Sequence, residues 1–247
     1  MFVDKAFKSS ADFDVYFFLQ ELKMLREISR DAIDLAKVKA DEASKYYTEV
    51  INGKVGGVAD ITDVSDKAYR SLVKYKLHFN YIVCHSLFTT AFSLFEVFLT
   101  KVGAFLEKGS KARIKLSDIS KKGGDLDKVR RYLDLVHMLN SARSDNETWQ
   151  KLAFFNKVRN LILHNGNSLK KDEVIDMQTK KFLEKRNVSV DKKEVFRIDQ
   201  PDFLDEFILL ATEYMKSLLD EIYSPNGPAS KFTEFQSPIY LDKALED

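Results

Sequence analysis

Apolar residues recur every three or four positions over most of this chain, which is the spacing of helices with one buried face. Residues 12–50 carry such a stripe, with charged residues opposite, and predict one long helix. Residues 63–108 predict a second helix, apolar around most of its circumference from 87 to 106 and so placed at the centre of a bundle. The remaining expected helices span residues 125–141, 144–167, 170–187 and 201–222.

Other patterns predict the connections between these helices. Residues 188–198 alternate valine and isoleucine around DKKE, which predicts a small β-hairpin. Residues 52–63 hold three glycines and predict a loop or a mobile flap. We therefore expect an all-α, up-and-down helical bundle with flanking helices and a hairpin, as a single domain over residues 1–223. Residues 224–247 predict a proline-containing tail that either docks through its aromatic side chains or stays mobile.

Charge and cysteine content restrict the cellular setting more than the chemistry. The formal net charge is 39 minus 38, or +1, so it does not indicate a nucleic-acid, membrane or other charged partner. A lone Cys84 suits a reducing cytoplasm, and the first residues contain acids rather than the apolar core of a secretory signal. The longest apolar patches look too short or interrupted to span a bilayer, so we expect a cytoplasmic protein with no membrane partner. Residues 101–131 hold ten Lys/Arg against four Asp/Glu, either a solvated surface or a patch for RNA phosphates.

The segment SDNETWQKLAFFNKVRNLILHNGN, residues 144–167, is the most informative part of the chain. Ser144 and Glu147 have the spacing of a capping box, in which each side chain satisfies a free backbone N–H of the first turn. Gly166 predicts a left-handed C-cap, since it lacks the side chain that disfavours positive φ. The expected buried face between them consists of Trp149, Leu152, Phe155, Val158 and Ile162.

Four polar residues gather towards the end of that helix. Asn156, Asn160 and His164 are i, i+4 and i+8 neighbours on one stripe, and Arg159 lies at its edge. The negative helix end favours a protonated imidazole at His164, a residue type suited to general acid–base work. The guanidinium of Arg159 is a planar cationic fork that fits a phosphate. No zinc-ligand spacing, glycine-rich phosphate loop or nucleophile elbow occurs, so these residues form a metal-free set suited to a phosphodiester.

The phrase RNLILHNG, with an asparagine directly after the arginine, resembles the R-x(4–6)-H motif of the HEPN superfamily, and in particular its ribonuclease branches. The resemblance implies a helical domain that cleaves RNA without a metal or other cofactor, leaving a 2′,3′-cyclic phosphate and a 5′-hydroxyl. It implies that His164 acts as the general base or acid, Arg159 neutralises the phosphorane and Asn160 positions the phosphate or the histidine. It further implies a homodimer with a composite site, and a toxin or antiviral-defence role with a possible antitoxin or regulatory partner. The chain exceeds the minimal HEPN core in size.

The second predicted helix contains a polar seam. His78, His85, Thr89 and Glu96 fall within about 40–60° of one another if every residue turns by 100°. Either Glu96 faces solvent or a subunit boundary and the histidines are ordinary helix residues, or Glu96 or His85 supports the Arg159 face, where a carboxylate would orient the guanidinium. A metal site from His78, His85 and Glu96 is a weaker alternative, because histidines seven residues apart stand about 10 Å apart along a helix.

Two other functions remain open at this point. The same helix end fits a non-catalytic HEPN-like dimer that binds a nucleotide or a partner protein. A plain helical scaffold would instead leave Arg159 and His164 apart on open surface.

Overall fold

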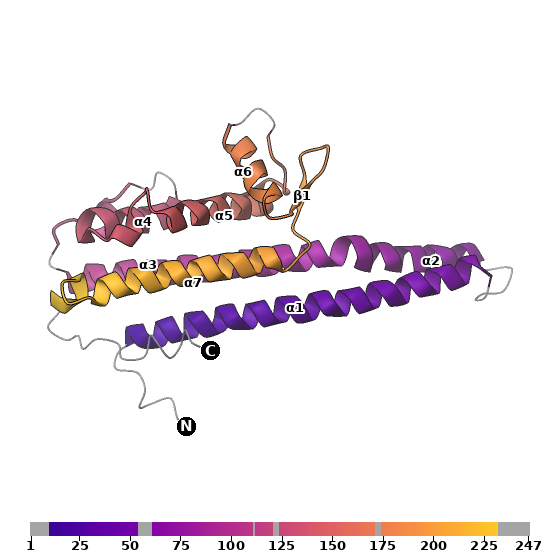
Figure 1. Cartoon of the computed structure of the whole chain (residues 1–247), viewed down its shortest axis with the longest axis horizontal. Coiled ribbons are helices and arrows are strands. Elements are labelled where there is room, and N and C mark those ends of the chain that lie inside the picture. Colours follow the sequence, from indigo (N-terminus) through magenta and orange to yellow (C-terminus); the bar gives the residue numbers. More distant parts are fainter. Residues whose placement is uncertain (1–9, 54–60, 111, 121–123, 171–173, 232–247) are drawn as a thin grey trace, which may run out of the picture. The chain divides into compact units, whose positions relative to one another are not determined.

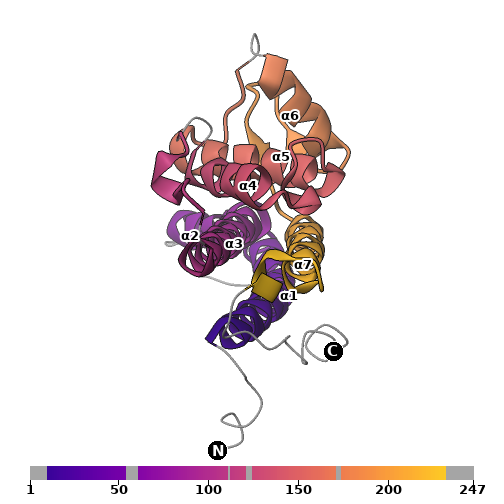
Figure 2. The ribbon, with the colours of Figure 1, turned by 90° about the vertical axis from the view of Figure 1, so that its left-hand side faces the viewer.

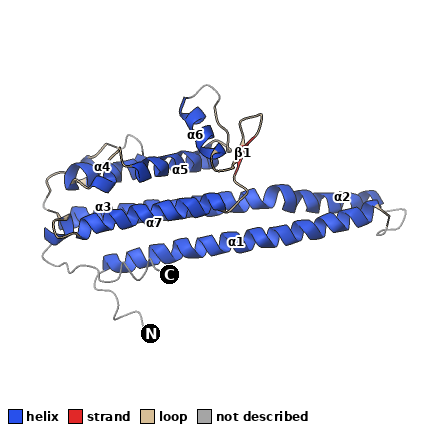
Figure 3. Cartoon of the chain, in the orientation of Figure 1, coloured by secondary structure: helices blue, strands red, loops and turns tan. Residues whose placement is uncertain are grey.

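The computed structural model describes residues 10–53, 61–110, 112–120, 124–170 and 174–231, and they are mostly helical, as predicted (Figures 1 and 3). Most of the glycine-containing loop and most of the tail lie outside these ranges. The described elements, including short 3-10 turns, are α1 (Ser10–Ile51), α2 (Ile61–Val73), a π-helical segment (Lys74–Phe79), α3 (Asn80–Gly109), a turn at Leu116–Asp118, α4 (Gly124–His137), a turn at Asn140–Ala142, α5 (Glu147–His164), α6 (Val174–Glu184), β1 (Ser189–Val190), β2 (Phe196–Arg197), α7 (Asp202–Tyr223) and a turn at Pro228–Lys231.

These elements belong to two compact units, which we describe separately. The first unit comprises residues 1–24, 90–157 and 206–247, and the second comprises residues 25–89 and 158–205. Each of the long helices α1, α3, α5 and α7 contributes one segment to each unit.

The first unit has an aromatic core between α3 and α7, which run next to each other (Figure 2). Phe92 stacks on Phe207 with ring centroids 5.2 Å apart, and both side chains are fully buried. α4 packs closely on α3 at Gly103, where an added Cβ would lie 2.9 Å from Val129. Further ring contacts bring in α1 through Phe18–Phe98 and α5 through Phe155–Phe207 and Trp149–Tyr214.

The second unit joins the later part of α1 to α2, the start of α3 and the start of α7. Asp205 binds Arg26 at 3.0 Å and Arg30 at 2.6 Å, which ties α1 to α7. Phe88 of α3 contacts Phe203 of α7 edge-to-face, with ring centroids 5.2 Å apart. Within this unit an ion-pair cluster thus ties α1 to α7, and aromatic packing ties α3 to α7.

The predicted helix over residues 63–108 is present, but it is not uniformly α-helical. It runs without a break from Ile61 to Gly109, and Lys74–Phe79 adopt a wider π-helical turn that the periodicity did not reveal. Contrary to our expectation, the stretch from Asp63 to Gly109 is long and apolar enough to cross a membrane, with a mean hydropathy of 1.7 over 18 residues. Of that window 44% is buried inside the protein, and the core helix of a soluble protein meets the same criteria, so the finding is weak evidence.

The predicted hairpin is confirmed. β1 pairs antiparallel with β2, with Ser189 opposite Arg197 and Val190 opposite Phe196. The side chain of Asp191 closes the turn, because it accepts the backbone N–H of Lys193 at 2.7 Å and that of Val195 at 3.0 Å. These hydrogen bonds, that from Val195 above all, lower the pKa of the Asp191 carboxyl.

Candidate functional site

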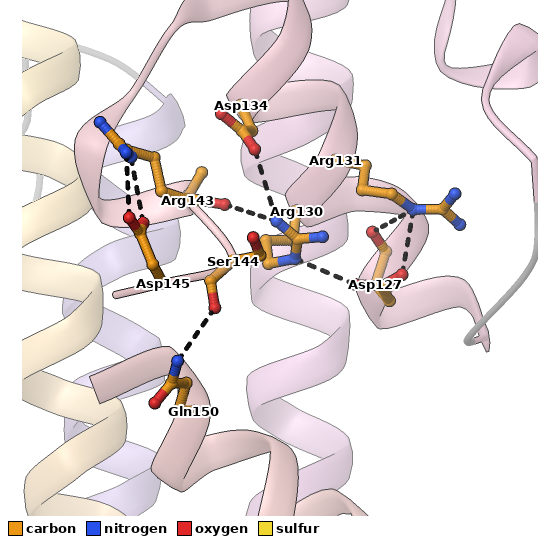
Figure 4. Close-up of polar contacts among 9 residues, drawn as sticks. Asp127, Arg130, Arg131, Asp134, Arg143, Ser144, Asp145 and Gln150 are labelled. Atoms are coloured by element: carbon orange, nitrogen blue, oxygen red, sulfur yellow. Dashed lines mark hydrogen bonds and ion pairs between the residues drawn. The ribbon is translucent and has the colours of Figure 1, made fainter. Parts of the chain in front are cut away.

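The start of α5 differs in one detail from the prediction. The helix begins at Glu147 and Asn146 is its N-cap, since the Asn146 side-chain oxygen accepts the backbone N–H of Trp149 at 2.9 Å. The expected capping box between Ser144 and Glu147 is therefore wrong. Ser144 instead uses its backbone carbonyl, which accepts a hydrogen bond from the Gln150 side chain at 3.4 Å (Figure 4).

A polar network next to this cap holds α4 to the start of α5 within the first unit (Figure 4). Arg130 is only 5% exposed and donates to Asp127 at 2.9 Å and to the carbonyl of Ala142 at 2.8 Å. Asp134 lies 3.6 Å from the same guanidinium, and the Trp149 ring centroid lies 5.5 Å from its central carbon. A buried guanidinium with this many partners is a structural tie, because removing both carboxylates would leave a buried charge unpaired.

The end of α5 matches its prediction in the second unit. The last helical residue is His164, and Gly166 follows in the left-handed region with φ +58°. An added Cβ at Gly166 would meet no atom within 4 Å, so its backbone angle rather than crowding favours glycine there. Of the predicted buried face, Ile162 is only half-buried and the neighbouring Leu161 is buried in its place.

The motif residues occupy the last turns of α5 in different settings. Arg159 and Asn160 are half-buried, and the Asn160 side-chain oxygen accepts a hydrogen bond from Arg159 Nη1 at 3.0 Å. The amide therefore fixes the direction of the guanidinium. His164 is exposed at the carbonyl end of the helix. Asn156 is half-buried one turn before Arg159.

The chain that follows His164 is fixed by the hairpin. The Asn167 carbonyl accepts the N–H of Phe196 at 3.0 Å, and the N–H of Leu169 donates to the Glu194 carbonyl at 2.9 Å. Ser168 forms an isolated antiparallel bridge with Val195 between these two bonds. Residues 167–169 thus pair with residues 194–196 next to the hairpin, although they do not form a regular strand.

His85 is a buried acceptor in the same unit. Its Nε2 accepts the N–H of Ile198 at 3.1 Å, and its ring contacts Tyr81 and Phe196. Burial lowers the pKa of His85 to about 4, so the imidazole is neutral near pH 7. This arrangement gives His85 a structural role beneath the hairpin, whereas an orienting contact to Arg159 stays a prediction.

Glu96 and His78, which were expected to share a polar seam with His85, lie in different settings. Glu96 is half-buried in the first unit, where its backbone carbonyl accepts the Thr100 hydroxyl at 2.8 Å. Arg159 belongs to the second unit, so the pairing of Glu96 with Arg159 stays a prediction. His78 lies in the π-helical segment, where residues do not turn by 100°, so the angular basis of the polar seam fails there.

Other chemical sites find little support in the described parts of the chain. No group of three or more His, Cys, Asp or Glu residues among them could hold a metal ion. Burial raises the pKa of the Cys84 thiol to about 12, which keeps it a thiol rather than a nucleophilic thiolate. The first unit has an open groove of about 620 Å³ between the α4–α5 connection and the end of α7, lined by residues such as Asn140 and Lys216. One of its polar groups, the Glu221 carboxylate, serves a structural contact, since it accepts the N–H groups of Asn140 and Ser141.

Two features of the site were not found from the sequence. Asn146 is one of three adjacent cap-forming residues, so local preference could not single it out. The pairing of Asn167 with Phe196 joins positions far apart in the chain and leaves no periodic signal. The turn residues after His164 did indicate that the helix stops, but not what the following segment contacts.

Comparison with known proteins leaves the family of this chain open. No family model matches it, and neither a curated protein nor a solved structure shows a significant match.

Proposed function

We propose that this protein is a metal-independent endoribonuclease of the HEPN type, whose chemistry resides in Arg159, Asn160 and His164. The observation that carries the proposal is the end of α5, where a guanidinium oriented by an adjacent asparagine is followed by a histidine on the last helical residue. The sequence RNLILHNG supports it through its resemblance to HEPN ribonucleases.

Each side chain has a definite role in the proposed reaction. His164 takes the proton from the ribose 2′-hydroxyl, whose oxygen attacks the neighbouring phosphorus. The bond from phosphorus to the 5′-oxygen then breaks, that oxygen gains a proton, and a 2′,3′-cyclic phosphate remains. Arg159 neutralises the charge that develops on the phosphorane oxygens, and its hydrogen bond to Asn160 reduces the cost of orienting it during the reaction.

The exposure of His164 suits a site completed by a second copy of the chain. Leu163 beside it is 49% exposed, so an apolar side chain and the proposed acid–base group share this surface. A symmetric dimer that brings two such helix ends together would exclude water and supply both an acid and a base. Such an enzyme fits a toxin or antiviral effector in the cytoplasm, held in check by an antitoxin or another regulatory partner.

The test is cleavage of single-stranded RNA by the purified protein in EDTA. His164→Ala should lower the rate about 10²–10⁴-fold and Arg159→Ala about 10²–10³-fold, as expected for loss of a general base and of an oxyanion-stabilising group. The cyclic phosphate product should be detected by mass spectrometry.

Asn165→Ala is the matched control, because Asn165 is the exposed residue directly after His164, and its backbone N–H and carbonyl make its hydrogen bonds to Leu161 and Ser168. It should cleave like the unchanged protein. Equal activity of the His164→Ala, Arg159→Ala and control variants would remove the enzymatic assignment. RNA binding without cleavage would favour a non-catalytic binding module.

A further inference from the structure

The described part of the second unit carries a local excess of positive charge around the hairpin. Residues 159–170 and 174–197 hold nine Lys/Arg against four Asp/Glu, an excess of five. This segment differs from residues 101–131, where the sequence first indicated a basic patch, because that patch belongs to the first unit and the motif to the second.

Most of the acids in this segment are already engaged. Asp176 is 2% exposed and accepts the backbone N–H of Lys170 at 2.8 Å. Asp191 closes the hairpin turn through two backbone N–H groups, and Glu194 pairs with Lys180 at 2.9 Å. Asp191 also attracts Arg197 and Lys193, so it offsets part of the positive charge of the hairpin, and the excess of Lys and Arg over Asp and Glu in this segment remains five.

Three exposed cations lie on the hairpin itself: Lys192 and Lys193 in its turn and Arg197 on β2, which we call the hairpin cations. The central guanidinium carbon of Arg197 lies 5.3 Å from the ring centroid of Tyr81. That stacking holds the guanidinium in place and leaves the edges of its fork for a phosphate.

Backbone pairing connects these cations to the motif. β2 is bonded to Asn167, three residues beyond His164, and the hairpin turn is bonded to Leu169 through Glu194. The hairpin cations and His164 therefore belong to one small, hydrogen-bonded substructure of the second unit.

We propose that the hairpin cations bind the phosphate backbone of the RNA strand that is cleaved at His164. This inference rests on the proposed ribonuclease function and names the surface that holds its substrate. Binding through phosphates carries no base information, so it fits an RNA substrate recognised along its backbone.

Binding can be measured separately from cleavage, by fluorescence anisotropy of a labelled ~15-nucleotide single-stranded RNA on His164→Ala protein at several salt concentrations. Adding Lys192→Gln, Lys193→Gln and Arg197→Gln should weaken binding about 10- to 100-fold at 0.1 M salt and reduce the log–log salt slope by about 2, since single strands lose roughly 0.7 per phosphate contact. Lys192→Gln with Lys193→Gln alone leaves the Tyr81 contact intact and should give about two thirds of that change in slope.

The matched control removes three charges elsewhere in the same unit: Lys37→Gln, Lys39→Gln and Lys45→Gln on α1. Lys37 and Lys39 are paired with Asp34 and Glu42, at 3.1 and 2.8 Å. This control should change affinity less than about twofold, as expected for rim charges that contact no ligand. Equal loss in the hairpin and α1 variants, no loss in either, or no RNA binding by the His164→Ala protein would each overturn the inference.

Cleavage and binding can fail independently in this design. If the unchanged protein binds RNA through the hairpin cations but cuts none, the surface stands and the catalytic assignment falls. If it cuts RNA and the hairpin variant binds and cuts normally, the catalytic assignment stands and the surface falls.

Discussion

His85 and His164 show how position sets the behaviour of one residue type. His164 is exposed at a helix end, whereas His85 is 7% exposed and lies against Tyr81, Phe196 and the Ile198 N–H. Arg197 and His78 both contact the Tyr81 ring of this cluster. His85 therefore affects stability, while His164 is the residue that we propose for the chemistry.

The burial of His85 predicts a loss of stability in acid. Its folded pKa of about 4 lies below the ordinary value of 6.5, so between these pH values the unfolded chain binds a proton that the folded chain does not. Stability should be unaffected by His85 above pH 6.5 and should fall by about 3 kcal/mol on going to pH 4. His85→Gln, whose amide oxygen can accept the Ile198 N–H, should lack this component of the loss.

Urea unfolding at pH 7 and pH 4.5 measures the effect for both proteins. Parallel pH profiles would show that His85 is not held neutral. A smaller acid loss in His85→Gln, with similar stability at pH 7, is the expected result.

At the level of elements, the connection from α4 to α5 is built from polar contacts to α7. Both carboxylate oxygens of Glu221 accept backbone N–H groups, from Asn140 at 2.6 Å and from Ser141 at 2.7 Å, and Ser141 also bonds Ser217. The chain enters this turn through Met138, which follows α4 with φ +55° and is 82% exposed. A methionine in that position carries a backbone penalty that no packing offsets.

Met138→Gly should therefore stabilise the protein by about 0.5–1 kcal/mol, since glycine adopts positive φ without a side-chain clash. Met138→Ala removes the same exposed side chain but keeps a Cβ, and it should leave stability nearly unchanged. Thermal and denaturant unfolding of the three proteins separate the two effects. Equal stabilities of the glycine and alanine variants would show that the backbone angle is not strained.

The helices were predictable from the sequence because their buried faces repeat, as Phe203, Phe207 and Tyr214 do along α7. The C-cap at Gly166 was predictable because glycine lacks the side chain that disfavours positive φ. The N-cap at Asn146, the wide turn near His78 and the contact of β2 with Asn167 were not. The periodicity of apolar residues does not reveal such features, because they depend on a choice among equivalent residues or on a partner far away in the chain.

At the scale of the whole molecule, the proposed enzyme requires two chains. Light scattering should give a mass of twice the 28.5 kDa chain. Coexpression of Arg159→Ala and His164→Ala chains should restore part of the cleavage lost in each. Random pairing of the two chains makes about half of the dimers hybrids, and each hybrid holds one intact arginine and one intact histidine. A monomeric mass with full activity, or hybrids as inactive as their parents, would contradict a composite site.

The π-helical segment at Lys74–Phe79 has a consequence for how this sequence can change. A wider turn alters the phase between the stretches before and after it, so α2 and the start of α3 need not present one continuous apolar stripe. An insertion or deletion of one residue within those six positions would interconvert an α-helical and a π-helical turn. The residues after it would then keep their contacts, because the helix beyond that turn would not rotate. We expect insertions and deletions in related chains to concentrate in this segment and to be rarer in the α-helical parts of the helix from Ile61 to Gly109.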